Sequence, residues 1–154
     1  MKIRKVRPDE WENLQALNNE VFVDNAKYDP DLVLDWAYSD EGRKYFQELV
    51  NDPDSICFVA EDNNKLVGYL AASPKLISYR KSRYLEVDNI GVIPTYRSHG
   101  VGKMLMDICK EWARENNYQK LYVNSYFQNE QAIRFYKKNG FNPIDISLEL
   151  ALSD

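Results

Sequence analysis

The stretch Val92-Ile93-Pro94-Thr95-Tyr96-Arg97-Ser98-His99-Gly100-Val101-Gly102-Lys103 joins an apolar strand to an amphipathic helix through a short glycine turn. The helix is predicted by apolar residues at i, i+3, i+4 and i+7 from Val101, namely Met104, Leu105, Ile108, Cys109, Trp112 and Ala113. The glycines therefore lie at the helix N-terminus, where the first N–H groups have no intrahelical partner and the dipole is positive. Because glycine also lets a ligand approach the backbone closely, the turn predicts a phosphate site.

Two widespread phosphate motifs do not fit this turn. The P-loop pattern G-x-x-x-x-G-K-[ST] is missing, and neither a third glycine nor a ribose-binding acid follows at the dinucleotide spacing. An isolated G-x-G could also be a simple turn. The pattern that fits is R-x-x-G-x-G at residues 97–102, preceded by V-x-P and followed by Asn129 and by A-I-R-F-Y-K-K-N-G-F at residues 132–141.

These two motifs, in this order, resemble the GNAT superfamily of N-acetyltransferases, and the resemblance is strongest from Tyr84 to Phe141. It implies a GNAT fold of the α/β (α+β mixed) class: a mixed, mostly antiparallel central sheet with helices on both faces and a splayed strand pair that binds the cofactor. It also implies transfer of an acetyl group from acetyl-CoA to a primary amine, by direct attack in a ternary complex and with no metal.

The composition fits one domain spanning residues 1–154, with 44% hydrophobic residues to form a core. A net charge of −4 argues against nucleic acid or an anionic membrane as the main partner. The N-terminus lacks the apolar run of a signal peptide, and no stretch of about 18 apolar residues occurs. Cys57 and Cys109 lie in apolar patterns typical of buried, reduced thiols, so we expect a cytoplasmic protein.

Hydrophobic periodicity predicts the order of the elements. Strands are expected at residues 2–7, 56–61, 66–73, 84–93 and 121–125, with a final strand within 141–150. Helices are expected at 8–22, from 101 onward and at 130–138, with one or two short helices over 32–50, broken near 39–42. Residues 62–65 predict a hairpin turn. This order favours a mixed sheet with helices on both faces.

The resemblance also implies which residues bind the cofactor. Main-chain groups near the end of the 84–93 strand would pair with the pantetheine arm, and backbone N–H groups of the turn would hold the pyrophosphate. The implied residues are Ile90, Gly91, Val92, Arg97, Ser98, His99, Gly100, Val101, Gly102, Lys103 and Asn129. Asn129 also suits a helix N-cap. The single histidine, His99, lies in the phosphate turn, far from the thioester, and is not expected to be the base.

For catalysis, the resemblance assigns Tyr136 as the general acid that protonates the leaving thiolate, while Phe135 beside it is expected to pack. A phenol of pKa ~10 can protonate a thiolate if desolvation favours the neutral thiol. The base candidates are Glu86 and Asp88, which share a face if their strand is regular. Either acid could equally be a solvated strand residue or part of a substrate pocket. Asn124 stands where enzymes that acetylate ribosomal-protein N-termini carry a glutamate base, which weakens that specific substrate assignment.

The acceptor amine stays open among a polyamine, an amino sugar, a peptide N-terminus and lysine. Acids beside aromatics suit a cationic amine, although a solvated acidic loop fits equally well; the residues are Asp24, Asp29, Asp31, Asp35, Trp36 and Tyr38. The competing functions are a non-catalytic acyl-CoA-binding module and a GNAT enzyme with a longer acyl donor. A homodimer is possible, because the short segment after Phe141 leaves a sheet edge that a second subunit could cover.

Overall fold

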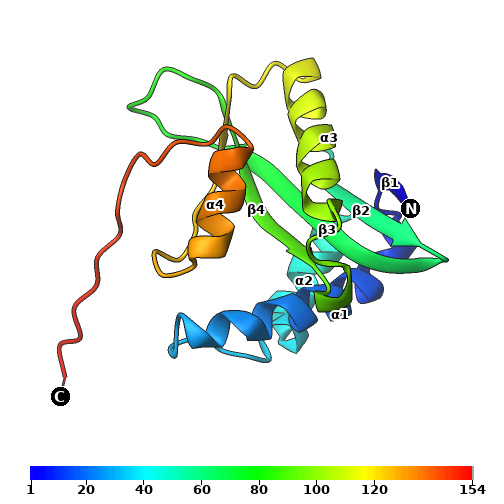
Figure 1. Cartoon of the computed structure of the whole chain (residues 1–154), viewed down its shortest axis with the longest axis horizontal. Coiled ribbons are helices and arrows are strands. Elements are labelled where there is room, and N and C mark those ends of the chain that lie inside the picture. Colours follow the sequence, from blue (N-terminus) through cyan, green and yellow to red (C-terminus); the bar gives the residue numbers. More distant parts are fainter. Residues whose placement is uncertain (154) are drawn as a thin grey trace. The chain divides into compact units, whose positions relative to one another are not determined.

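The computed structural model describes residues 1–153, and the chain forms two compact units, Met1–Asn124 and the part from Ser125 onward (Figure 1). The first unit contains β1 (Lys2–Lys5), α1 (Trp11–Phe22), α2 (Asp40–Leu49), β2 (Ile56–Asp62), β3 (Lys65–Lys75), β4 (Tyr84–Val92), α3 (Val101–Glu115) and β5 (Lys120–Tyr122). Short 3-10 turns, η1 to η4, lie at Pro8–Glu10, Val23–Lys27, Trp36–Tyr38 and Pro94–Tyr96. The second unit contains α4 (Glu130–Lys138). None of the described helices is long and apolar enough to cross a membrane.

The sheet of the first unit has the order β1-β2-β3-β4-β5, in which every pair is antiparallel except the parallel pair β4–β5. The predicted hairpin is confirmed: β2 and β3 are joined at Asn63 and Asn64, both of which have positive φ, a conformation that asparagine tolerates. The expected mixed, mostly antiparallel sheet is therefore confirmed.

Helices cover both faces of this sheet. On one face, Tyr69 of β3 accepts a hydrogen bond of 2.7 Å from Asn18 Nδ2 of α1, and a Cβ at the neighbouring Gly91 would meet Val21 of α1 at 2.8 Å. On the other face, a Cβ at Gly68 would lie 3.2 Å from Val101 of α3. Because successive strand residues point to opposite faces, α1 and α3 sandwich the middle of the sheet.

The buried stripe of α3 differs from the predicted one, because Met106 joins it, Met104 leaves it, and Ile108 and Trp112 are only half-buried. The buried apolar residues are Val101, Leu105, Met106, Cys109 and Ala113, whereas Met104 is 40% exposed. At 100° per residue, the stripe through 101, 105, 109 and 113 turns Met104 to the outer side and Met106 inward. The prediction that both cysteines are buried is confirmed, and burial raises the pKa of both Cys57 and Cys109 to about 12.

The final strand predicted within residues 141–150 is wrong, because the structure assigns no strand there. The alternation of Ile144, Ile146, Leu148 and Leu150 is typical of a strand, but a strand also needs a hydrogen-bonded neighbour, and the described sheet of β1 to β5 does not include this segment. The four side chains are 56–92% exposed. The strand expected at 121–125 is also shorter than predicted, since β5 ends at Tyr122.

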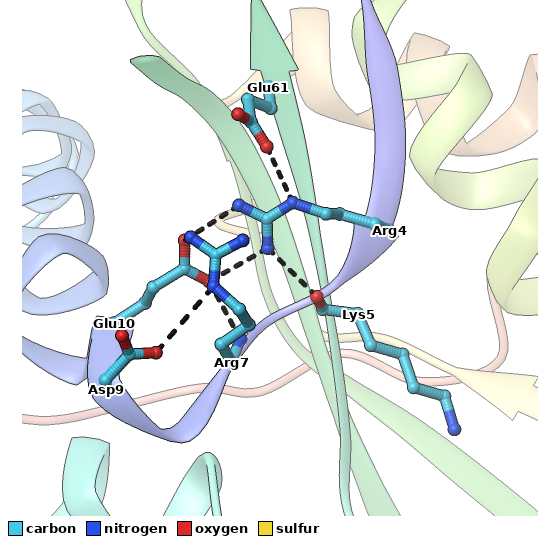
Figure 2. A network of polar contacts seen from close by, with 6 residues as sticks. All are labelled: Arg4, Lys5, Arg7, Asp9, Glu10 and Glu61. Atoms are coloured by element: carbon cyan, nitrogen blue, oxygen red, sulfur yellow. Dashed lines mark hydrogen bonds and ion pairs between the residues drawn. The ribbon is translucent and has the colours of Figure 1, made fainter. Parts of the chain in front are cut away.

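A charge network fixes the N-terminal strand to the first helical turn (Figure 2). The carboxylate of Glu10, with 9% of its side chain exposed, accepts hydrogen bonds from the Arg4 guanidinium at 2.7 and 2.9 Å and from the Arg7 backbone N–H at 2.8 Å. Arg4 also donates to Glu61 of β2 at 2.6 Å. The Arg4 hydrogen bonds are the main cause that lowers the pKa of Glu10 to about 2.

We predict that Glu10→Gln lowers the free energy of unfolding at pH 7 by about 2 kcal/mol, because charged hydrogen bonds to Arg4 and Arg7 are lost. The folded-state pKa of about 2 lies below the ordinary 4.5, so this stability is present above about pH 4.5 and is lost as the pH falls toward 2. In denaturant unfolding measured from pH 7 to 2, the free energy of unfolding should therefore change less with pH in the variant than in the unmodified protein. Asp9→Asn is the control, because the Asp9 side chain is 81% exposed; equal losses in both variants would contradict the prediction.

Candidate functional site

The glycine turn has the geometry expected of an anion site at a helix start. Gly100 is the N-cap of α3, and its φ of +79° lies in the left-handed region that side-chain-bearing residues avoid. Ser98 also has a positive φ, of +63°. Nothing lies within 4 Å of a Cβ placed on Gly100, so the approach to the first turn is open. The N–H groups of that turn are left for a ligand or solvent.

The side chains of the turn are engaged elsewhere in the structure. Arg97 donates from Nε to the Val92 carbonyl and from its terminal nitrogen to Asp24, both at 2.9 Å. Lys103 forms an ion pair with Asp107, one turn along α3. His99 is exposed, and its Nδ1 lies 2.8 Å from the Arg97 carbonyl oxygen. The backbone of the turn, rather than these cations, is therefore the more accessible binding element.

Strand β4 loses its partner on one side before it reaches the turn. The parallel pairing with β5 covers Tyr84–Glu86 on β4 and ends there, while the antiparallel pairing with β3 continues to Val92. One residue beyond β4, the Ile93 N–H still donates a hydrogen bond to the Val67 carbonyl of β3. Because main-chain groups alternate along a strand, those of Ile90 and Val92 face the open edge and those of Gly91 face β3.

A bulge at Asp88 interrupts the regular strand. Val87 pairs with Ala72 and Asn89 pairs with Ala71, so Asp88 has no opposite residue on β3. Its carboxylate accepts a hydrogen bond of 2.6 Å from the Ser73 hydroxyl. Asp88 is exposed by surface area, yet desolvation by nearby protein atoms is the largest cause that raises its pKa to about 6. The negative charge of Glu86 adds to this rise, whereas the Ser73 bond and the Lys75 charge oppose it.

Glu86 has a different environment although it lies on the same strand. Its carboxylate is 3.2 Å from the Lys75 ammonium, and that ammonium also lies 4.6 Å from the ring centre of Tyr122 on β5. The structure thus brings Glu86 and Asp88 together but gives them different partners. Ser73 and Lys75 were not predicted as site residues. Ser73 ends the predicted 66–73 strand and pairs with Glu86 in the register, whereas Lys75 lies beyond that predicted strand and pairs with Tyr84.

The second unit contains the other two predicted site residues. Asn129 is the N-cap of α4, and its side chain accepts a hydrogen bond of 3.1 Å from the Ala132 N–H, so its capping role is confirmed. The Tyr136 ring packs edge-on against Phe135 and Phe141, with centroids 5.4 and 5.6 Å apart. Burial raises the pKa of Tyr136 to about 12.

The acidic segment before α2 is only partly available for contact with a substrate. Asp24 is bonded to Arg97, and Asp29 accepts a hydrogen bond from the Asp31 backbone. Trp36 packs against Tyr45 and Phe46 of α2, with centroid distances of 5.7 and 6.4 Å. Tyr38 remains 49% exposed. The segment is thus a mixture of packing residues and exposed acids.

Comparison with known proteins is consistent with this geometry. The chain matches the acetyltransferase (GNAT) family over residues 10–141, a range that includes residues of both units. An uncharacterised N-acetyltransferase of Archaeoglobus fulgidus is 30% identical over 141 residues, covering 88% of this chain and 89% of the relative. An uncharacterised N-acetyltransferase of Methanocaldococcus jannaschii is 31% identical, covering 68% of this chain but only 46% of its own length. Streptothricin acetyltransferase A of Bacillus subtilis is 28% identical, covering 69% of this chain and 65% of the relative.

Solved structures share the fold. A protein of Bacillus halodurans aligns with a TM-score of 0.84 at 20% identity, covering 99% of this chain and all of the other. AAC(6′)-Iy, in complex with the bisubstrate analogue CoA-S-monomethyl-acetylneamine, aligns with a TM-score of 0.75 at 16% identity, covering 99% of this chain and 98% of the other. The glycine turn, the sheet and the family match agree, and we conclude that this chain belongs to the GNAT acetyltransferase family.

Proposed function

We propose that the protein is an acetyl-CoA-dependent N-acetyltransferase that transfers an acetyl group to a primary amine by direct attack in a ternary complex. The observation that carries the proposal is the open edge of β4, which leads directly into the helix-start turn and has a carboxylate at its bulge. The family match spans residues of both units, which supports their acting as one domain. Direct transfer asks the protein for positioning and polarisation rather than for a nucleophile.

The first unit offers two kinds of cofactor contact. The main-chain groups of Ile90 and the N–H of Val92 suit the amides of a pantetheine arm, which would bind like an added strand, whereas the Val92 carbonyl already accepts a hydrogen bond from Arg97. The backbone N–H groups from Ser98 to Lys103 suit a pyrophosphate. Gly91 serves a different purpose, because its missing side chain lets α1 lie against β4 at Val21. Arg97 would reach a phosphate only by exchanging its contact with Asp24.

Asp88 is the base that the geometry favours. An acceptor amine is protonated at neutral pH and must lose a proton before it attacks the acetyl carbonyl. A carboxylate of pKa about 6 accepts that proton better than an ordinary aspartate while remaining ionised at pH 7. Glu86 is already paired with Lys75 at 3.2 Å, which makes it the weaker candidate.

Tyr136 is the proposed general acid. Its role comes from the family motif that the sequence matches over residues 132–141, and its raised pKa of about 12 keeps the phenol protonated at neutral pH. A protonated phenol can deliver its proton to the thiolate as the thiolate leaves. Asn129 is proposed as a cofactor contact in addition to its capping role.

The acceptor is proposed to be a small-molecule or peptide amine. A streptothricin acetyltransferase is among the relatives, an aminoglycoside N-acetyltransferase shares the fold, and the exposed acids near α2 suit a cationic substrate. The buried free thiols of Cys57 and Cys109 accord with a reducing, cytoplasmic location.

We predict that Gly100→Val weakens acetyl-CoA binding at least tenfold, because a β-branched residue at φ +79° costs roughly 1–2 kcal/mol and disturbs the first turn of α3. Titration calorimetry measures the affinity directly. Gly140→Val is the matched control for backbone strain, since Gly140 has a φ of +97° and open space around its Cβ. Unchanged affinity in Gly100→Val would remove the turn from the binding site.

We predict that Asp88→Asn lowers turnover by about 10²- to 10⁴-fold and removes the limb near pH 6 from the pH profile of kcat/KM, since this limb reports protonation of the base in the free enzyme. Ser73→Ala should move the limb to higher pH, because the hydrogen bond from Ser73 stabilises the ionised Asp88 carboxylate and is lost in this variant. Glu86→Gln should move it to lower pH, because a negative neighbour is lost. The acceptor amine used in this assay should have a pKa well above 7, so that the limb caused by its own titration is separate from the limb near pH 6.

These three variants separate the candidate bases. If Glu86→Gln removes the limb and Asp88→Asn leaves it, Glu86 is the base and the assignment to Asp88 is wrong. Calorimetric affinity for acetyl-CoA should stay close to that of the unmodified protein in all three, which distinguishes a lost proton acceptor from a lost cofactor site.

A further inference from the structure

Tyr45 of α2 is half-buried, and its hydroxyl makes no hydrogen bond within residues 1–153. Two aromatic neighbours hold its ring: the ring centres of Trp36 and Phe46 lie 5.7 and 5.0 Å from that of Tyr45. Phe46 is completely buried, so it anchors this aromatic group in the core. A tyrosine hydroxyl in such surroundings usually has a polar partner. The Tyr45 phenol is therefore held in a fixed direction and is free to bind a ligand.

Tyr45 lies over the same face of the sheet as the carboxylate of Asp88. Cys57 of β2 pairs with Ala71 of β3, and Ser73, two residues further along β3, points to the same face as Ala71. The Ser73 hydroxyl donates to Asp88 at 2.6 Å, which brings that carboxylate to this face. Burial is the largest cause that raises the pKa of the Tyr45 phenol, and the charges of Asp88 and Cys57 raise it further. The phenol and the proposed base thus share one face, and all five residues belong to the first unit.

We propose that Tyr45 binds and orients the acceptor, its phenol oxygen accepting a hydrogen bond from the attacking amine while Asp88 takes the proton of that amine. This inference rests on the proposed function and adds the residue that orients the acceptor. An alkylammonium carries three N–H donors, so two fixed acceptors leave its nitrogen little freedom to turn. The proton passes to the Asp88 carboxylate, and the lone pair left on nitrogen forms the C–N bond. The electron pair of the C–S bond then leaves with the thiolate.

The charges around this position limit the class of acceptor. Trp36 and Tyr45 offer aromatic rings, which attract an ammonium group. Asp88 and Glu86 are both acids, and the neighbouring cation Lys75 is already paired with Glu86 at 3.2 Å. A carboxylate next to the reacting amine would therefore meet charge of its own sign. The expected acceptor is an aliphatic ammonium with no adjacent carboxylate, which excludes the α-amine of a free amino acid.

The first test is Tyr45→Phe, which removes the hydroxyl and keeps the packed ring. The acceptors are spermidine, kanamycin, streptothricin and alaninamide, with free alanine as the acid that matches alaninamide. For each amine that turns over, kcat/KM should fall about tenfold or more, as expected for a lost hydrogen bond to a charged group. Calorimetric affinity for acetyl-CoA should not change. The limb near pH 6 should also stay in place, because the phenol is uncharged at that pH and does not act on the pKa of Asp88.

Tyr118→Phe is the matched control, because Tyr118 is also half-buried and stacked on a tryptophan, with its ring centre 6.0 Å from that of Trp112. It should keep the kinetic constants of the unmodified protein. An unchanged kcat/KM in Tyr45→Phe would overturn the inference alone, and so would an equal loss of acetyl-CoA affinity, since the hydroxyl would then support the fold. Acetylation of free alanine would overturn the expected acceptor class. No thiol release by the unmodified protein with any amine would instead overturn the proposed function, and this inference with it.

A second measurement observes the phenol directly and needs no turnover. In protein labelled with 3-fluorotyrosine, the ¹⁹F signal of Tyr45 is the one that disappears in Tyr45→Phe, and that of Tyr118 is assigned in the same way. With CoA bound, at least one of the same four amines should shift the Tyr45 signal and leave the Tyr118 signal in place. A Tyr45 signal that does not respond to an amine that the enzyme acetylates would overturn the inference.

Discussion

The pairing between β4 and β5 ends at Glu86 and Tyr122, and the candidate site depends on that early end. Had β5 continued beside β4, its backbone would occupy the groups that Ile90 and Val92 now direct to the open edge. After β4 ends at Val92, the chain passes through η4 to the left-handed Gly100 and the first turn of α3. Backbone donors suited to an extended arm and donors suited to phosphates therefore lie in sequence along one continuous stretch of chain.

Close packing on the two faces of the sheet holds this stretch in place. The absent side chain of Gly91 makes room for Val21 of α1, and that of Gly68 makes room for Val101 and Leu105 of α3. The buried Gln15 side chain donates to the Ala37 carbonyl at 2.7 Å, which ties α1 to η3 before α2. Protein interiors transmit displacement because they are densely packed, so the start of α3 cannot shift without the sheet.

Local patterns allowed the sequence to predict the helices, the hairpin and the glycine turn, because each depends on neighbours a few residues apart. Local patterns could not decide which of the two strand acids is the better candidate for the base. Asp88 and Glu86 look alike until the bulge and the register place Ser73 and Lys75 against them. The final strand was mispredicted for a related reason: alternation from Ile144 to Leu150 favours extended backbone, but a strand also requires pairing with a neighbour, which a local pattern does not encode.

The most direct measurement of the central claim is a two-substrate rate experiment on the full chain with acetyl-CoA and a panel of amines that includes aminoglycosides, streptothricin, polyamines and short peptides. Thiol release and acetylated product are followed together. We expect at least one amine to give equal amounts of thiol and acetyl-amine, with intersecting double-reciprocal plots, as a ternary complex requires. Parallel plots would contradict direct transfer. Tight CoA binding without thiol release for any amine would contradict the assignment as an enzyme.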